Sequence, residues 1–513
     1  MPSPPEGSAD RTWALVATVM LLLLGFALRL VLLTGPVGSD DTNYFVFSQK
    51  LAHLEHFDRL HHHGGRLAFL ALVGVPAALF DSIYFGSFVN VLFYLARDVV
   101  VVWFVCRQLG HTSAAIAAGF LSLNAISMAY AGTLVPDGVL SFAMVGSVIV
   151  AMQAASWAGR RRLSWLLGSG MIAACGYSAK DTGILIVPCV LLVIFLARPL
   201  RSFKPIEFVS GAVAFLVGFG SVAVAEMFAY YLLSGDPLYR LHAISSTHNA
   251  NGDVFEAGSL YEFVKSGNWN LRIITGPTSA SMPVLAVAVL AWMFALHARA
   301  QLRLFTVIGA ALSVYLTFGS SSLTRLIALP VQDRYFEVVV PFVAVSLASA
   351  WALFQKSAMG LEPVARRVLL VVTGLFVFNM PGALFNSGEI GASGIARNTA
   401  IAVRSIQATN PSAAIVLARP LHFAVQTFLE PHEFKSLKTF EGSVPEMPGY
   451  YIPHPWRPVR SEPPVSLSID KLPVFMTVSQ DHRFARYLPH RSDGRDVVVR
   501  LCDRSAGCPA GRN

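Results

Sequence analysis

Long hydrophobic runs, separated by short polar connections, make up most of the chain before residue 387. A helix needs about 20 apolar residues to cross the roughly 30 Å of hydrocarbon in a bilayer. The pattern therefore predicts about eleven membrane-spanning helices, the first of them retained in the mature chain. These spans are expected at residues 13–34, 84–106, 112–130, 137–157, 163–179, 182–197, 207–233, 281–298, 303–319, 335–355 and 366–386. The expected fold class is an all-α polytopic membrane protein.

The overall composition agrees with this prediction. Hydrophobic residues make up 54% of the chain and charged residues only 13%, and the mean hydropathy is +0.56. A soluble domain of this length could not bury so large an apolar fraction in its core. The net charge of +9 does not indicate nucleic-acid binding, because Lys and Arg gather in short clusters between the apolar runs.

These basic clusters predict the orientation of the spans. They lie in every second connection, at Arg107; at Arg160, Arg161 and Arg162; at Arg198, Arg201 and Lys204; at Arg299 and Arg303; and at Lys356, Arg366 and Arg367. Lys and Arg are enriched in cytoplasmic loops, so these connections are expected in the cytoplasm. The outer connections are then 35–83, 131–136, 180–181, 234–280, 320–334 and the tail from 387. Because the carboxylates near the membrane boundaries gather on that side, we expect a periplasmic active face in a bacterial inner membrane.

Two segments differ from the spans. The first outer connection, 35–83, is too long for a turn, and we expect helices that lie at the membrane interface there. The tail, 387–513, is rich in Pro and in mixed charge, with alternating runs such as Ala413–Ala418 and Pro473–Val478. These runs predict a small α/β domain outside the membrane. The transmembrane domain is therefore expected at 1–386.

Two of the five cysteines, Cys502 and Cys508, lie in this tail. An oxidising compartment would permit a disulfide between them. Spacing alone does not distinguish a disulfide from two free thiols, and both interpretations stay open.

An acid pair, Asp40 and Asp41, directly follows the first span. Tyr44 lies four and three residues further on, so on a helix it shares a face with one of the two acids. A carboxylate here could accept the proton of an attacking hydroxyl or amine group. The same residues could instead form the capped first turn of a helix, a feature worth about 1 kcal/mol. The spacing does not distinguish these roles, which are compatible.

Further charged residues lie at the same expected face. Asp137 opens the fourth span, Lys180 and Asp181 separate two short spans, and Arg334 begins the tenth. Each has a structural alternative. An acid after Pro is favourable in a first helical turn, a lysine can extend to the interface, and Asp333 could pair with Arg334.

Four charged residues lie within expected spans and are functional candidates by position: Arg29, Arg97, Asp98 and Glu226. Arg240 begins the large outer loop and adds a cation to the outer face. Acids and cations at one membrane surface suit the transfer of a group from an anionic lipid phosphate.

Five short stretches carry a resemblance to a known class of proteins. They are Ser39-Asp40-Asp41-Thr42-Asn43-Tyr44, Leu134-Val135-Pro136-Asp137, Ala179-Lys180-Asp181-Thr182-Gly183, Gly235-Asp236-Pro237, and Arg334-Tyr335 before Pro341. In this order they resemble the landmarks of the GT-C membrane glycosyltransferases that use polyprenyl-phosphate sugars. The similarity is to glycosyltransferase family 39, with its protein O-mannosyltransferases and lipid A aminoarabinose transferases, and it covers about residues 12–355. Asp41 stands where that family more often has Glu.

The resemblance implies a GT-C fold and an inverting transfer of sugar from a polyprenyl-phosphate donor to a lipid, glycan or protein acceptor. It implies that Asp40 is the base and that Asp137 supports the acceptor or the base, with Asp41 as the third member of the catalytic set. Lys180 and Arg334 would hold the donor phosphate. The expected substrate-binding set is Tyr44, Arg66, Lys180, Asp181, Arg240, Arg334 and Tyr335. Membrane lipids are the other expected partners, and nucleic acid is not expected.

One stretch departs from the family. Where the family often has His-Pro-Pro or Lys-Pro, this chain has His61-His62-His63-Gly64-Gly65-Arg66. Three consecutive histidines are not expected to face one ion, so solvated or phosphate-facing side chains are the preferred interpretation. We expect no cofactor and no metal ligands, with a divalent metal as the alternative.

Two other functions fit a polytopic chain. A transporter or flippase for a lipid-linked glycan would show paired broken helices in two related halves, and no such repeat is visible in the sequence. A non-catalytic envelope assembly protein would use the tail for contacts. An enzyme should instead gather Asp40, Asp137, Lys180 and Arg334 around one outer cavity. A nucleotide-sugar donor is not expected, because no nucleotide-binding glycine loop occurs.

Overall fold

The computed structural model describes residues 8–31, 39–57, 60–196, 205–246, 259–275, 281–320 and 333–356, with isolated positions between them. In the tail it describes a discontinuous set of positions from 399 to 452, and residues 500–502. Backbone contacts divide the chain into two units. The first comprises residues 1–33 and 44–388, and the second comprises residues 34–43 and 389–513.

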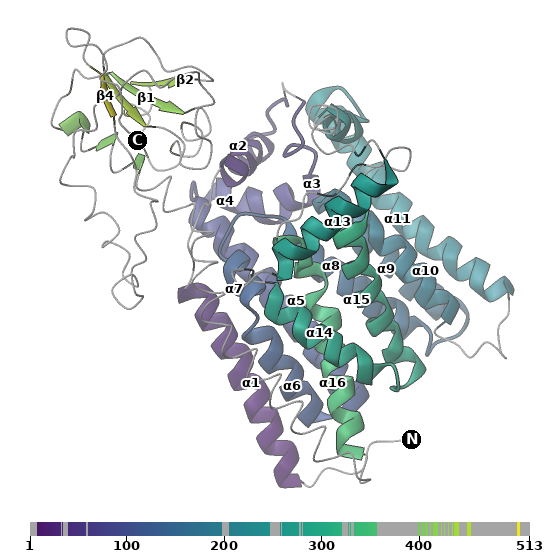
Figure 1. Cartoon of the computed structure of the whole chain (residues 1–513). Helices are drawn as coiled ribbons and strands as arrows, with labels where there is room; N and C mark the ends of the chain where they lie inside the picture. Colours follow the sequence, from purple (N-terminus) through teal and green to yellow (C-terminus); the bar gives the residue numbers. More distant parts are fainter. Residues whose placement is uncertain are drawn as a thin grey trace. The chain divides into compact units, whose positions relative to one another are not determined.

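The regular elements described in the first unit are all helices (Figure 1). Its long helices are α1 (Ser8–Val31), α5 (Ile83–Leu109), α6 (His111–Ser122), α8 (Asp137–Ala154), α9 (Gly159–Ala179), α10 (Ile186–Leu196), α11 (Pro205–Ser234), α13 (Leu260–Thr275), α14 (Met282–Ala295), α15 (Ala300–Phe318) and α16 (Val340–Lys356). Shorter pieces are α3 (Leu67–Phe69), the π-helical η1 (Leu70–Gly74), α4 (Val75–Leu79), α7 (Ala125–Ala131) and the 3-10 helices η2 (Asp181–Leu185) and η4 (Asp333–Val338). Helix α2 (Ser39–Ala52) begins in the second unit and continues into the first.

The helices coincide with the apolar runs of the sequence as far as residue 356. Among the described residues, five helices are long and apolar enough to cross a membrane, and the pair α6 and α7 adds a sixth if it forms one span. Others, such as Asp181–Leu196 and Met282–Ala295, are apolar but shorter. The expected last span, 366–386, lies outside the described residues.

The third expected span, 112–130, is not one continuous helix. Helices α6 and α7 meet at an angle of 54°. The break lies at Asn124, whose Oδ1 atom accepts a hydrogen bond of 3.0 Å from the backbone N–H of Ser127. This side chain caps α7 and starts a new helix there, because Asn satisfies a free N–H of the first turn. Helix α6 packs against α1, α5 and α16 (Figure 1).

Two glycines allow close packing of α9 against α11. A Cβ atom on Gly170 would lie 2.0 Å from the carbonyl oxygen of Phe215, and one on Gly218 would lie 2.1 Å from that of Leu167. Neither position tolerates a side chain, so the two helix backbones approach closely, as small residues permit between membrane helices. This packing brings the C-terminal end of α9 next to the later part of α11.

The described part of the second unit contains a four-stranded mixed sheet in the order β2-β1-β3-β4. Strand β1 (Ile415–Ala418) pairs in parallel with β2 (Leu437–Phe440) and β3 (Gly449–Ile452), and β3 pairs antiparallel with β4 (Arg500–Cys502). The run Ala413–Ala418 thus contains a strand. The run Pro473–Val478 and Cys508 lie outside the described residues, so the disulfide between Cys502 and Cys508 stays a prediction.

Candidate functional site

An ion pair between Asp137 and Lys180 lies at the centre of the charged residues in the first unit. Lys180 Nζ lies 2.5 Å from Asp137 Oδ1. Asp137 is in the first turn of α8, and Lys180 ends α9 with extended backbone angles, φ −157° and ψ 141°. The break in the helix after Ala179 therefore places the lysine against the start of α8. Both side chains are buried.

The start of α8 is held tightly against α5. A Cβ atom on Gly138 would lie 2.5 Å from the ring of Tyr94 and 2.7 Å from Asn90 Oδ1. The Nδ2 atom of Asn90 donates to the carbonyl oxygen of Thr133 at 2.9 Å. These contacts fix the connection before α8, and with it the position of the Asp137 carboxylate. Its second oxygen, Oδ2, is buried and accepts no hydrogen bond from the described residues.

Three further cationic and aromatic groups surround this pair. Lys180 Nζ lies 4.1 Å from the ring centroid of Tyr335, and the Arg334 guanidinium lies 5.8 Å from the same centroid. Burial lowers the pKa of Lys180 from 10.5 to about 8, Asp137 opposes this shift, and the positive charges of Arg334 and Arg66 add to it. The predicted cations Lys180, Arg334 and Arg66 therefore lie close enough to influence one another.

The short helix η4, which carries Arg334 and Tyr335, is anchored at both ends. At its start, Asp333 Oδ1 accepts hydrogen bonds from the hydroxyls of Ser279 at 2.7 Å and Ser281 at 2.5 Å. Near its end, the Glu337 carboxylate forms an ion pair with Arg97 of α5 and accepts a hydrogen bond of 2.8 Å from Ser127. Arg97 and Ser127 therefore fix the end of η4 relative to α5 and α7, and Ser279 and Ser281 fix its start to the connection before α14.

Arg97 belongs to a buried charge network that links five helical elements. Its Nη2 atom lies 2.7 Å from Asp98 Oδ1, and Asp98 also pairs with Arg29 of α1 at 2.7 Å. Arg97 further donates to Ser141 of α8 at 3.4 Å. Two arginines, Arg29 and Arg97, and two carboxylates, Asp98 and Glu337, make a neutral set. Of the four charged residues expected within spans, Arg29, Arg97 and Asp98 belong to this network and Glu226 does not.

Glu226 instead binds Arg240. The Arg240 guanidinium lies 3.1 Å from Glu226 and 2.9 Å from Asp181, donates to the backbone carbonyl of Tyr177, and stacks over the Tyr177 ring at 3.9 Å. Glu226 also accepts a hydrogen bond of 2.7 Å from Ser178. Two carboxylates thus pair with the single positive charge of Arg240, which ties α11 and the following loop to the end of α9.

Tyr44 forms the centre of an aromatic group in the connection between α1 and α5. Its buried ring meets the rings of His63 at 4.5 Å and Phe69 at 4.9 Å edge to face, and the Arg66 guanidinium lies 5.3 Å from its centroid. The Tyr44 hydroxyl is buried and forms no hydrogen bond with the described residues. The expected contact residues Tyr44 and Arg66 are therefore adjacent.

Asp40 and Asp41 occupy the first turn of α2. Asp41 is buried, with 1% of its surface exposed, and Asp40 is half-buried. Two acids in a first turn interact favourably with the helix dipole, as the structural interpretation expected. Both belong to the second unit, whereas Asp137 and Lys180 belong to the first.

Several residues at the site were missed by sequence reasoning. Glu337 could have been found as a carboxylate inside an expected span, a position that is costly unless paired. Ser178, Tyr230 and Tyr239 offered no such signal, because hydroxyl groups are common in membrane helices. The three histidines at 61–63 lie close together, with one ring nitrogen from each within 4.8 Å of the other two, and the expected absence of metal ligands stays a prediction.

Comparison with known proteins extends this picture. Residues 68–224 match a family described as dolichyl-phosphate-mannose-protein mannosyltransferase. The structure of ArnT from Cupriavidus metallidurans bound to undecaprenyl phosphate aligns with 98% of this chain and 99% of its own, with a TM-score of 0.54 and 15% identity. The chain has the GT-C fold. Its long apolar helices are those of a polytopic GT-C membrane protein.

Two other solved structures support the same fold. The apo form of the same ArnT covers 87% of this chain and 94% of its own, with a TM-score of 0.51 and 14% identity. The apo oligosaccharyltransferase of Archaeoglobus fulgidus covers 85% of this chain, with a TM-score of 0.51 and 12% identity. This chain spans 65% of that protein's length. No curated protein sequence matches the chain. The matched family and these structural neighbours are glycosyltransferases.

Proposed function

We propose that this protein transfers a sugar from a polyprenyl-phosphate-linked donor to a lipid, glycan or protein acceptor. The reaction takes place at the periplasmic face of a bacterial inner membrane, with inversion at the anomeric carbon. The family match and the fold of ArnT, solved with undecaprenyl phosphate, support a lipid-phosphate donor. The basic clusters on alternate connections support the orientation.

The observation that carries this proposal is the gathering of Lys180, Arg334 and Arg66 beside Asp137 in a buried part of the first unit. Lys180 is buried, Arg334 and Arg66 are half-buried, and the positive charges of these two arginines act on the lysine. A donor phosphate is an anion that such cations can bind. The Asp137 Oδ2 atom and the Tyr44 hydroxyl are buried polar atoms with no hydrogen-bond partner among the described residues, which is typical of groups that bind a ligand.

In the proposed reaction, Asp40 accepts the proton of an acceptor hydroxyl or amine. The freed electron pair attacks the anomeric carbon, and the bond from that carbon to the phosphate oxygen breaks on the opposite face. Polyprenyl phosphate leaves with one more negative charge than the donor phosphodiester carried. Lys180 and Arg334 stabilise this developing charge, as fixed cations do in a water-poor site.

Asp137 holds the Lys180 ammonium in place and directs it toward the donor. Tyr335 and Tyr44 supply aromatic surfaces beside the cations. Arg240 and Asp181, expected to bind substrate, are tied to each other and to Glu226. We therefore assign them to positioning the end of α9, and with it Lys180, with Asp41 supporting Asp40 from the same helical turn.

The test measures the transfer of radiolabelled sugar from polyprenyl phosphate in membranes that carry each variant at matched protein levels. Lys180→Ala and Arg334→Ala should weaken donor use, seen as a higher donor KM. Arg160→Ala is the matched control, because Arg160 is an exposed cation at the opposite end of the helix that ends before Lys180. Unchanged donor dependence in Lys180→Ala and Arg334→Ala would contradict the assignment.

A second measurement identifies the product class. Lipids, polysaccharides and glycoproteins are compared between a deletion strain and its parent. Loss of one sugar from one of these classes, restored by the wild-type gene and not by Lys180→Ala, is the expected result. An unchanged glycan composition, with accumulation of a lipid-linked glycan on one side of the membrane, would indicate a flippase instead.

A further inference from the structure

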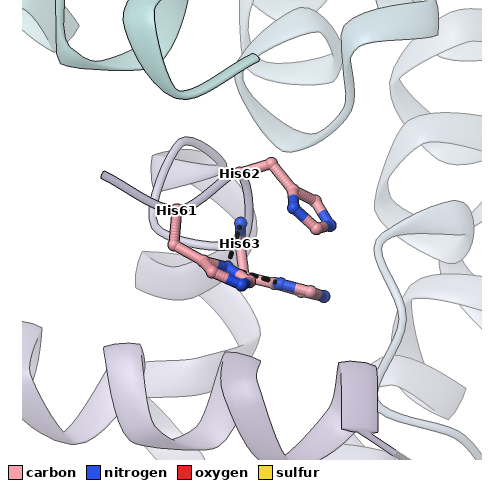
Figure 2. A group of neighbouring side chains, drawn as sticks. All are labelled: His61, His62 and His63. Atoms are coloured by element: carbon pink, nitrogen blue, oxygen red, sulfur yellow. Dashed lines mark hydrogen bonds between the residues drawn. The ribbon is translucent and has the colours of Figure 1, made fainter. Parts of the chain in front are cut away.

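The histidines at 61–63 form a cluster in which three imidazole rings meet (Figure 2). His61 and His63 are stacked with ring centroids 4.7 Å apart and planes at 18°, and the ring of His62 lies 3.9 Å from that of His63. The Nδ1 atoms of His61 and His63 are 2.9 Å apart. One ring nitrogen from each residue lies within 4.8 Å of the other two.

The loop that carries these histidines is fixed by contacts from α11 and the segment after it. Tyr230 donates a hydrogen bond of 3.1 Å to the carbonyl oxygen of Gly64, and the backbone N–H of His61 donates to the Tyr239 hydroxyl at 3.3 Å. A Cβ atom on Gly64 would lie 2.6 Å from that hydroxyl and 2.7 Å from the Phe47 ring. A side chain there would displace the Tyr239 or Phe47 ring, so the loop is packed closely onto its neighbours.

The imidazole rings are held as firmly as the backbone. His63 has only 2% of its surface exposed and meets the Tyr44 ring at 4.5 Å. His61 is stacked on Phe47 at 6.0 Å. Ordering three histidine side chains beside one another costs rotamer entropy. Because packing already orders them without a ligand, this cost does not reduce the affinity for a ligand.

The geometry suits one metal ion. Two Nδ1 atoms 2.9 Å apart share a single hydrogen, and a metal ion at that position would bind both. Zn²⁺ binds histidine nitrogens at about 2.0–2.1 Å, which in tetrahedral geometry separates the nitrogens by about 3.3 Å. The His61 and His63 nitrogens need to part by a few tenths of an ångström. The half-buried His62 side chain would have to rotate to bring its ring nitrogen closer to the other two.

We propose that His61, His62 and His63 form a binding site for one divalent transition-metal ion of the zinc type. Imidazole ligands favour such ions over Mg²⁺ and Ca²⁺, which prefer oxygen. Three histidines leave the fourth position of a tetrahedral zinc ion open to water or to a substrate oxygen. The Tyr44 ring contacts both His63 and the Arg66 guanidinium, so the ion would lie in the same aromatic group as a predicted donor-binding cation.

The metal site itself does not depend on the proposed function. If that function holds, the ion and Arg66 together would favour an anionic oxygen such as that of the donor phosphate. This second step rests on the proposed function, and binding of the metal alone is measured separately so that the two can fail independently.

The test uses the full-length protein in detergent, purified with a tag that contains no histidine, stripped with a chelator and titrated with Zn²⁺. Metal content after dialysis and affinity against a competing chelator are both measured. The wild type should retain about one equivalent. His61→Ala, His62→Ala and His63→Ala should each weaken affinity by about tenfold or more, at least the loss seen when a residue that only orients a metal ligand is changed.

His53→Ala and His56→Ala are the matched controls, because both histidines are exposed and lie a few residues before the cluster. They should bind Zn²⁺ like the wild type. Because His63 is buried, the result for His63→Ala is used only if this variant elutes like the wild type in size-exclusion chromatography. If it does not, His61→Ala and His62→Ala decide the test. Co²⁺ replacement should give the visible absorption of a tetrahedral site in the wild type and in the two control variants, and not in the cluster variants. Equal Zn²⁺ affinity in the wild type and the cluster variants, or no retained metal in the wild type, would overturn the proposal.

Discussion

Lys180 Nζ lies 2.5 Å from Asp137 Oδ1, and the two side chains are only 7% and 1% exposed. Removing one partner of a buried pair leaves an uncompensated charge, which typically costs about 3–5 kcal/mol, whereas replacing both partners is often nearly neutral. Stability and donor binding should therefore respond differently to single and double substitutions at this pair.

The first prediction uses that difference. Asp137→Ala should lower the free energy of unfolding by about 3–5 kcal/mol, because the Lys180 ammonium is left buried without its carboxylate. The double variant Asp137→Asn with Lys180→Met should recover most of that stability and still bind the donor poorly. Thermal unfolding in detergent and donor binding are measured on the same samples. If the loss of unfolding free energy in the double variant equals the sum of the losses from the single substitutions, the two residues are not coupled.

The second prediction concerns pH. Burial lowers the pKa of Lys180 to about 8, so the ammonium is charged below pH 8 and increasingly neutral above it. A donor phosphodiester keeps its charge over this range. Donor affinity should therefore fall as the pH rises through about 8. Lys180→Arg is the matched control, because a guanidinium stays charged, and any binding that this variant retains should not change between pH 7 and 9. The same decline in both proteins would assign it to another group.

Sequence and structure agree most closely where the physical signal is local. Apolar runs locate helices because each must cover its backbone polar groups in hydrocarbon, and Asp137 and Lys180 were placed at one face by counting spans. The break at Asn124 was missed in the sequence, because a single polar residue within an apolar run is only weak evidence that a helix ends there. The pairing of Glu337 with Arg97 joins residues 240 positions apart, and no local pattern reports such a contact.

The same limit applied to the histidines. Side chains of consecutive residues usually diverge, and on that basis no shared ion was expected. In the structure a turn brings them together, with backbone hydrogen bonds from Gly64 to His61 and from Gly65 to His62. That turn depends on Tyr230 and Tyr239, which come more than 160 residues later. Local spacing could not have shown it.

The third prediction concerns the charge network behind η4. Arg97→Met should destabilise the protein by about 3–5 kcal/mol, because the Glu337 and Asp98 carboxylates lose their buried partner. Since Glu337 is three residues from Arg334, the milder Glu337→Gln should raise the donor KM more than it lowers kcat. Arg107→Ala, at an exposed cation of the same helix α5, serves as the control and should have little effect. A normal donor KM in a folded Glu337→Gln variant would argue against a positioning role.

The fourth prediction tests the orientation of the chain. Basic residues on alternate connections predict that the tail from about residue 387 lies outside the cytoplasm. A reporter that is active only in the cytoplasm, fused after Asn513, should therefore give no signal, whereas the same reporter fused after Arg160 should be active. A strong signal from the C-terminal fusion would contradict the predicted number or direction of the spans.

The last prediction separates the two acids of the first outer connection. Asp40→Asn keeps the size of the side chain and removes its basicity, so the transfer rate should fall by roughly 100-fold or more, the usual contribution of a general base. Asp41→Asn should do less harm, because the proposed role of Asp41 is to support the first turn of α2, a contribution of about 1 kcal/mol. Both variants should be expressed and folded. Transfer of radiolabelled sugar is measured at matched protein levels over a range of pH, because loss of the base also removes the acidic limb of the rate profile. Nearly wild-type activity in Asp40→Asn would refute the base assignment. The buried position of Asp41 makes the opposite order of damage a meaningful outcome, since it would move the base to Asp41 and leave Asp40 as the stabilising acid.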